Sequence, residues 1–329
     1  MPGNSAFSNT ITQVKGVAIL LVVLGHIASP LGGIIFSFHI PLFFFLGGIF
    51  IKLAYPGADF LKKNLVRLIV PYFIFGALGL VVNDIKNVLL HRPQEDIFQS
   101  IIGLLYWMDA PHLQHYGMVL WFLPALFWAR ILSFCLLKYL KLNELLLFML
   151  CAMCAYLFTN PATTLPFGLD KGMVALPWVF MGSVFCRNKE KLLALSIWKV
   201  APVVLLVFLI VYFDGMPRLD MAAKDVDHIF LTLPYTFSVI FLIVYLTHAV
   251  NVGGLTQLKT FSDFISNFGN QSMLVYVVHP YTGNVAYLMS IFFLGEGHWV
   301  FRLALTTAML MLVIKIRLRH QDSSLFKYL

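Results

Sequence analysis

Long apolar runs separated by short polar segments follow one another along the whole chain. A helix needs about 20 mostly apolar residues, with a range of roughly 17–25, to cross the hydrocarbon core of a bilayer. Ten segments reach or nearly reach this length: 15–30, 34–53, 67–89, 118–138, 143–159, 172–187, 197–213, 229–249, 272–294 and 298–317. The apolar stretch 97–108 is too short to span and predicts an interfacial or re-entrant piece. The pattern predicts an all-α fold, a polytopic transmembrane helix bundle of about ten spans.

Composition narrows the class of protein in the same direction. Of the 329 residues, 60% are hydrophobic and 12% are charged, whereas a soluble domain is about half apolar and about a quarter charged. A soluble globule of this composition would lack the polar surface to cover itself, and a disordered chain would be far more polar. No linker or break in composition interrupts the runs, so we expect a single membrane domain over residues 1–329.

The basic residues of the chain indicate how the helices are oriented in the membrane. Lys and Arg total 23 and Asp and Glu total 15, which gives a net charge of +8. A basic soluble protein would suggest nucleic acid as a partner, but basic residues of membrane proteins collect on the cytoplasmic side. With a cytoplasmic N-terminus, 16 of the 23 basic residues fall on that side, 6 fall on the other, and Arg130 lies within a span. We therefore expect both termini in the cytoplasm, membrane lipids as surroundings and no nucleic-acid partner. The acidic loop Asp214–Asp227 then lies outside.

Ionisable residues inside a span are costly and mark functional candidates. His26 lies late in the first span, to which Lys15 also belongs. At about 100° and 1.5 Å per residue, the two side chains share a helix face and lie about 16 Å apart along the axis. Lys15 is then expected at the cytoplasmic boundary and His26 near or just past the midplane. A helix-packing His satisfied by a neighbouring hydroxyl explains the position of His26 equally well.

Three other polar positions join this set. His39 is expected at the outer end of the second span, at a depth similar to that of His26, because a short link makes the first two spans a hairpin. Arg67 opens the third span, where it can snorkel to the interface or bind a phosphate; position alone favours snorkelling. Arg130 lies near a helix end, where snorkelling also accounts for it.

The ninth span carries the last pair of candidates. Tyr276 and His279 are three residues apart, so they share a helix face. The only closely spaced thiols, Cys151 and Cys154, lie inside an apolar run without the polar shell that a zinc or redox site needs. No nucleophile elbow, phosphate-binding loop or zinc-protease motif occurs in the sequence. We therefore expect no metal.

These motifs together resemble the acyltransferase 3 family of bacterial integral-membrane O-acyltransferases, and most closely the branch of fucose 4-O-acetylases and surface-polysaccharide acetyltransferases. The resemblance rests on ordered motifs between residues 15 and 280, which are Lys15 to Gly25-His26, Phe38-His39-Ile40-Pro41 to Gly47-Gly48, Arg67 with Pro71-Tyr72, Trp121-Phe122-Leu123, and Gly269 and Ser272 through Tyr276 to His279. Each motif alone is weak, whereas the ordered set is fairly specific.

The sequence departs from the family pattern at three places. The family usually has Arg where this chain has Lys15, and often has Asp where it has Thr12. The common Phe-x-Ser-Gly is here Phe45-Leu46-Gly47-Gly48, without the Ser. Lys15 keeps the positive charge but loses the planar fork of Arg. The missing Asp leaves His26 without an obvious carboxylate partner.

The resemblance implies an acyl-CoA donor, most often acetyl-CoA as co-substrate, and an acceptor hydroxyl of a sugar in a surface glycan or its lipid-linked precursor. It also implies a multi-pass protein of the bacterial inner membrane. His26 would be the catalytic base, because a neutral imidazole can deprotonate the hydroxyl. Lys15 and Arg67 would hold the CoA phosphates. His39, Tyr276 and His279 would be supporting polar donors.

Two other functions fit the same residues. A secondary transporter or exporter of a saccharide-type substrate would use the histidines as proton relays. The sequence shows no internal repeats or paired broken helices, which counts against that alternative. A non-catalytic membrane component of an envelope complex is a third, weaker alternative.

Overall fold

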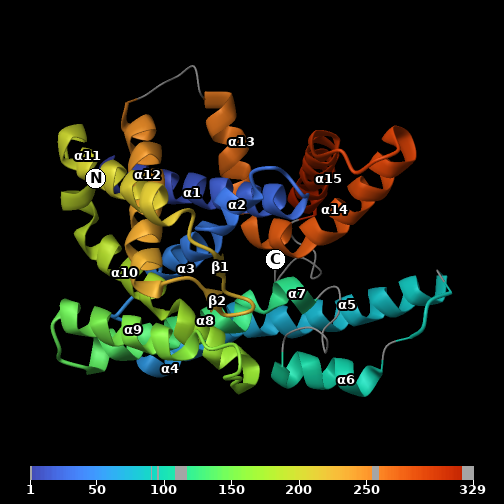
Figure 1. Ribbon diagram of the computed structural model, residues 1–329, viewed down its shortest axis with the longest axis horizontal. Helices are drawn as coiled ribbons and strands as arrows, with labels where there is room; N and C mark the ends of the chain where they lie inside the picture. The colour runs from blue at the N-terminus through green and yellow to red at the C-terminus, as the bar shows by residue number, and fades with distance from the viewer. Residues whose placement is uncertain (1, 90, 95, 108–116, 254–258, 321–329) are drawn as a thin grey trace.

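The computed structural model describes residues 2–89, 91–94, 96–107, 117–253 and 259–320, and these form an almost entirely helical bundle (Figure 1). The helical elements are α1 (Pro2–His26), α2 (Gly32–Phe36), α3 (His39–Ile49), α4 (Gly57–Asn64), η1 (Leu65–Ile69), α5 (Val70–Leu89), α6 (Ile97–Ile102), η2 (Gly103–Trp107), α7 (Gly117–Leu120), α8 (Phe122–Tyr139), α9 (Glu144–Phe158), η3 (Pro166–Gly168), α10 (Leu169–Leu193), α11 (Ile197–Asp214), α12 (Ile229–Val252), α13 (Lys259–Asn270), α14 (Ser272–Leu294) and α15 (Trp299–Arg319). One hairpin of two short antiparallel strands, β1 (Leu219–Asp220) and β2 (Asp225–Val226), interrupts the helices. The predicted all-α bundle is confirmed.

All ten expected spans are helical, but they differ in how well they suit a bilayer. Among the described residues, eight segments are long and apolar enough to cross a membrane: Ala6–His26, Gly32–Ile49, Gly57–Leu89, Phe122–Tyr139, Pro166–Leu193, Ile197–Asp214, Ile229–Val252 and Trp299–Arg319. The other two expected spans are α9, with only 15 residues, and α14, which has 23 residues but falls outside this set. The chain is therefore a polytopic membrane protein.

The short apolar stretch after α5 forms two small helical pieces, α6 and η2. It packs against the start of α5, because the Tyr72 hydroxyl donates a 2.5 Å hydrogen bond to the carbonyl of Leu104, and both residues are buried. Met108, at the end of the predicted piece, lies outside the described residues. Six residues of α-helix are too few to span a bilayer, as the sequence predicted.

The first helix differs from its predicted boundaries. α1 begins at Pro2 and ends at His26, so Lys15 lies inside the span Ala6–His26 and His26 lies at its end with an exposed side chain. The helix thus begins well before the predicted start of the first span, and it ends at His26 rather than at residue 30. The alignment of the two side chains along one helix is unchanged.

α1 can begin earlier than predicted because the polar residues of its early turns find hydrogen-bond partners inside the bundle. The Gln13 amide donates to the Ser262 hydroxyl on α13 and accepts from the Asn251 amide on α12. The Thr10 hydroxyl lies 3.1 Å from Nδ1 of His248 on α12. Because these polar groups are satisfied, the helix continues through a polar stretch that the apolar run length left outside the first predicted span.

Close helix crossings hold the core of the bundle together. Figure 1 shows α1 running across the middle of the molecule, with α12 and α13 meeting it. α3 and α10 touch backbone to backbone, since a Cβ at Gly48 would overlap the carbonyl of Val179 and one at Gly182 would overlap that of Phe45. Small residues of this kind let membrane helices approach closely. The crossing of α3 and α10 positions the C-terminal end of α3, which lines the pocket described below.

Reporter fusions test the predicted orientation in the membrane. Ser37, at the junction of α2 and α3, lies 2.9 Å from the Tyr235 hydroxyl, which contacts Met216, so the loop Asp214–Asp227 lies at the same end of the bundle as the α1–α2 link. A phosphatase active only outside the cytoplasm is expected to be active when inserted in that loop and silent when fused after Leu329, because of the distribution of basic residues. Activity at the C-terminus would reverse the assignment.

Candidate active site

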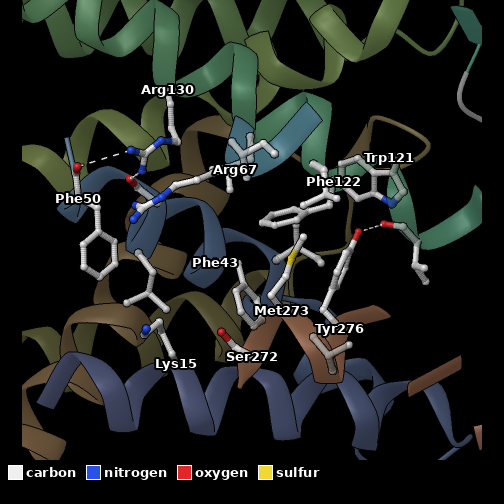
Figure 2. A pocket seen from close by; sticks show the side chains of 18 of the residues that line it. Lys15, Phe43, Phe50, Arg67, Trp121, Phe122, Arg130, Ser272, Met273 and Tyr276 are labelled. Carbon is white, nitrogen blue, oxygen red and sulfur yellow. Dashed lines mark hydrogen bonds between the residues drawn. The ribbon is translucent and has the colours of Figure 1, made fainter. Parts of the chain in front are cut away.

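A pocket of about 280 Å³ lies between α1, α3, η1, α8 and α14 (Figure 2). It brings together five of the residues predicted from the sequence, which are Lys15, His26, Arg67, Tyr276 and His279. They come from three separate parts of the chain. The aromatic motif Trp121-Phe122 adds a wall from the start of α8. Residues that the sequence linked only through the order of their motifs therefore line one pocket.

One end of the pocket is strongly cationic. Figure 2 shows the guanidinium groups of Arg67 and Arg130 side by side, with the Lys15 ammonium pointing into the pocket from α1. Of the described side chains that line the pocket, none is Asp or Glu. Neighbouring cations without a counter-charge repel one another, so an anionic ligand would stabilise this end.

Arg67 is carried by a π-helical segment, η1, at the entry to α5. π-Helical turns inside α-helices are rare and frequently occur at functional sites. The sequence alone favoured snorkelling for Arg67. The structure places its side chain, which is exposed overall, at the pocket.

Arg130 belongs to the pocket too, a position that the sequence interpretation of it as a snorkelling residue did not include. Its Nε donates a 2.6 Å hydrogen bond to Oδ1 of Asn64, its Nη1 donates to the carbonyl of Gly47, and its Nη2 lies 3.5 Å from the carbonyl of Phe50. The last carbonyls of α3 carry the negative end of the helix dipole, so a cation there is favourable. Arg130 thus joins α8 to α3 and α4. These partners are 66 to 83 residues away in sequence, and no local signal reveals them.

The other end of the pocket holds two histidines. Nδ1 of His26 lies 2.8 Å from the carbonyl oxygen of Val22, and Nδ1 of His279 lies 2.8 Å from that of Tyr276 and 3.3 Å from that of Val275. A carbonyl can only accept, so each Nδ1 carries a hydrogen, and in the neutral ring each Nε2 then carries the lone pair. The ring centroids are 5.2 Å apart with an interplanar angle of 73°.

This tautomer equips His26 to accept a proton. The backbone carbonyl of Val22 orients its ring. The ring lines the pocket and is also exposed at the end of α1, so it can be reached both from the pocket and from the surface of the bundle. The same tautomer leaves His279 with no hydrogen on Nε2. In this tautomer Nε2 of His279 accepts a hydrogen bond rather than donating one.

The remaining supporting residues have different positions. The Tyr276 hydroxyl lines the pocket but already donates to the carbonyl of Val119 (Figure 2). His39 is 2% exposed, bonds the carbonyl of Ile35 through Nδ1 at 2.8 Å, and is not among the described residues that line the pocket. The Phe36 ring contacts the rings of both His26 and His39.

Metal ligands are not clustered in the part of the chain that the structure describes. No group of three or more His, Cys, Asp or Glu side chains could hold a metal ion there.

Comparison with known proteins bears on the class of reaction. A search of curated proteins finds no match to the chain. The model of the acyltransferase 3 family, described as an acyltransferase domain, matches residues 9–316, which cover nearly the whole chain and every residue that lines the pocket. A membrane bundle with this match is a membrane acyltransferase, and the chain belongs to the acyltransferase 3 family.

Proposed function

We propose that the protein is an integral-membrane O-acyltransferase that moves an acyl group, in the simplest case acetyl, from acyl-CoA to a sugar hydroxyl. The acceptor would belong to a surface glycan or its lipid-linked precursor. The observation that carries the proposal is the pocket itself, which joins a cationic end to a histidine end within one apolar-walled space. The inner bacterial membrane, where both substrates meet, is the proposed location.

The donor matches the pocket in charge and length. The phosphates of CoA would bind Lys15, Arg67 and Arg130, since guanidinium groups suit phosphate geometry. The thin arm that ends in the thioester would lie along apolar side chains such as Phe43 and Met273. Lys15 and His26 share α1, so about three turns of helix separate the anchoring charge from the imidazole.

The transfer then requires one base. The lone pair on Nε2 of His26 would take the proton of the acceptor hydroxyl as its oxygen attacks the thioester carbonyl. The C–O bond forms, the C–S bond breaks, and the leaving thiolate takes the proton back from the imidazolium. The products are an ester and free CoA, and the histidine returns to its neutral state.

A transporter would also use a polar pocket in the membrane, and turnover separates the two functions. Membrane vesicles containing the protein are expected to release CoA from radiolabelled acetyl-CoA and to transfer the label to their glycan fraction. Vesicles without the protein are the control. Movement of a saccharide across the membrane without consumption of acetyl-CoA would support the transporter instead.

Substitutions at the cationic end test the donor assignment. Lys15→Ala and Arg67→Ala are each expected to raise the KM for acetyl-CoA with a smaller change in kcat, because the phosphates are bound equally in ground and transition states. Lys15→Arg keeps the charge and is expected to be milder. Lys62→Ala is a matched control, since Lys62 is exposed on the same helical segment and outside the pocket. Unchanged acetyl-CoA binding by both Ala variants in detergent would refute the assignment.

A further inference from the structure

An unsatisfied nitrogen at the histidine end carries a second inference about the reaction. Nε2 of His279 is buried and has no hydrogen-bond partner among the described residues, and the residue is 2% exposed. Leaving a buried polar atom unpaired is unfavourable, and each such atom in a native structure calls for an explanation. Since Nδ1 holds the hydrogen, this nitrogen can only accept.

The nearest titratable neighbour across the pocket is the other imidazole. The rings of His26 and His279 are 5.2 Å apart between centroids, and a nitrogen lies outside its ring centroid. Two ring nitrogens that point toward each other across this separation would lie at hydrogen-bonding distance, and the proposed contact requires both Nε2 atoms to take up that orientation. In the neutral state both Nε2 atoms carry lone pairs and cannot bond to each other. One added proton makes such a bond possible.

We propose that His279 is a second catalytic residue, whose Nε2 accepts a hydrogen bond from the protonated His26 and shares the proton with it during acyl transfer. This inference rests on the proposed function. It explains why a buried imidazole nitrogen is left unpaired in the resting protein. It also replaces the role of donor, for which His279 has no hydrogen available.

The proton balance of the step is simple. The acceptor hydroxyl gives its proton to Nε2 of His26 while its oxygen bonds to the carbonyl carbon. The resulting N–H of His26 donates to Nε2 of His279, and the positive charge is spread over both rings. When the C–S bond breaks, the thiolate takes that same proton, and both rings return to the neutral state. No oxidant, reductant or further co-reactant is needed.

Other charged and titratable groups surround the two rings. His39 on α3 lies beyond the Phe36 ring of α2, and Tyr276 precedes His279 by one turn on α14. Lys15, Arg67 and Arg130 add positive charge at the other end of the same pocket. α15 packs against α14 and brings Arg302 over the ring of Tyr287, which lies about two turns beyond His279 on α14. These cations and the repulsion between like charges oppose a second proton on the pair.

Matched asparagine variants distinguish the role of Nε2 from that of Nδ1 in each ring. In His279→Asn the side-chain amide replaces the Nδ1 donor to the carbonyl of Tyr276, whereas nothing replaces Nε2. A charge-assisted hydrogen bond is lost, so kcat for acetyl transfer in membranes with endogenous acceptor is expected to fall about ten- to a hundredfold. The KM for acetyl-CoA is expected to stay unchanged. His39→Asn removes an imidazole with the same backbone bond outside the pocket and is expected to cost much less.

The double variant tests whether the two rings act as a unit. His26→Asn with His279→Asn is expected to be no slower than His26→Asn alone, because the second ring only acts on the protonated first. Normal turnover of His279→Asn would overturn the proposal, as would two losses that multiply in the double variant. If His279→Asn fails to insert in the membrane, His279→Leu supplies the comparison, since it also leaves no acceptor at the position of Nε2.

A spectroscopic measurement separates this proposal from the proposed function. In the full chain labelled with ¹⁵N-histidine in detergent, both Nε2 signals are expected to move together as the pair takes up one proton. In His26→Asn the His279 signal is expected to stay neutral over that pH range. An unchanged His279 titration in His26→Asn would overturn the shared proton whatever the activity. A shared proton in a protein that never consumes acetyl-CoA would refute the proposed function and leave the pair intact.

Discussion

Replacing His26 with Gln is expected to lower acetyl transfer by about 10²- to 10⁴-fold, which is the range that general-base catalysis contributes. Gln keeps most of the size of the side chain and can still donate and accept hydrogen bonds. It has no lone pair that takes a proton at neutral pH, so the acceptor hydroxyl is no longer deprotonated as it attacks. The rate is measured as label transferred from acetyl-CoA in membranes, normalised to the amount of inserted protein.

The alternative that His26 only packs helices makes the opposite prediction. It expects His26→Gln to be active and His26→Ala to insert poorly. His26 has an exposed side chain at the end of α1, and its ring lies against those of Phe36 and His279. Near-normal turnover by His26→Gln would remove His26 as the base and leave His279 as the next candidate.

Replacing Asp170 with Asn is expected to cost about 3–5 kcal/mol of folding free energy, because it leaves a buried ammonium without its counter-charge. Nζ of Lys224 lies 2.7 Å from Oδ2 of Asp170, and each side chain is 4% exposed. Lys224 also donates to the carbonyl of Thr163. The pair ties the hairpin of β1 and β2 to the start of α10. A fall of several degrees in the Tm of the detergent-purified protein is the expected reading.

Two controls show whether burial causes this effect. The ion pair between Arg187 and Glu144 has the same 2.7 Å separation but exposed fractions of 35% and 51%. Glu144→Gln is therefore expected to change the Tm little, since exposed pairs contribute about 0–1 kcal/mol. Asp170→Leu with Lys224→Met removes both charges and is expected to recover much of the stability. Equal losses for Asp170→Asn and Glu144→Gln would contradict the argument.

Apolar run length predicted the class of this protein because the bilayer imposes it. Every expected span is helical, since a chain in hydrocarbon must satisfy its own backbone hydrogen bonds. The boundaries of α1 could not be predicted in the same way. The polar side chains of Thr10 and Gln13 are acceptable inside the bundle only because α12 and α13, far along the chain, supply their partners His248 and Ser262.

The sequence by itself determined the membrane bundle, the family motifs and the alignment of Lys15 with His26 on one helix face, because each follows from local periodicity or order along the chain. Only the tertiary structure decided which of those residues lie together in one pocket. Arg130 joins the cationic end through carbonyls at the distant end of α3. The unpaired nitrogen of His279 is visible only where α14 meets α1. Sites are made by contacts between distant segments, and one-dimensional patterns carry no information about which partner each polar atom finds.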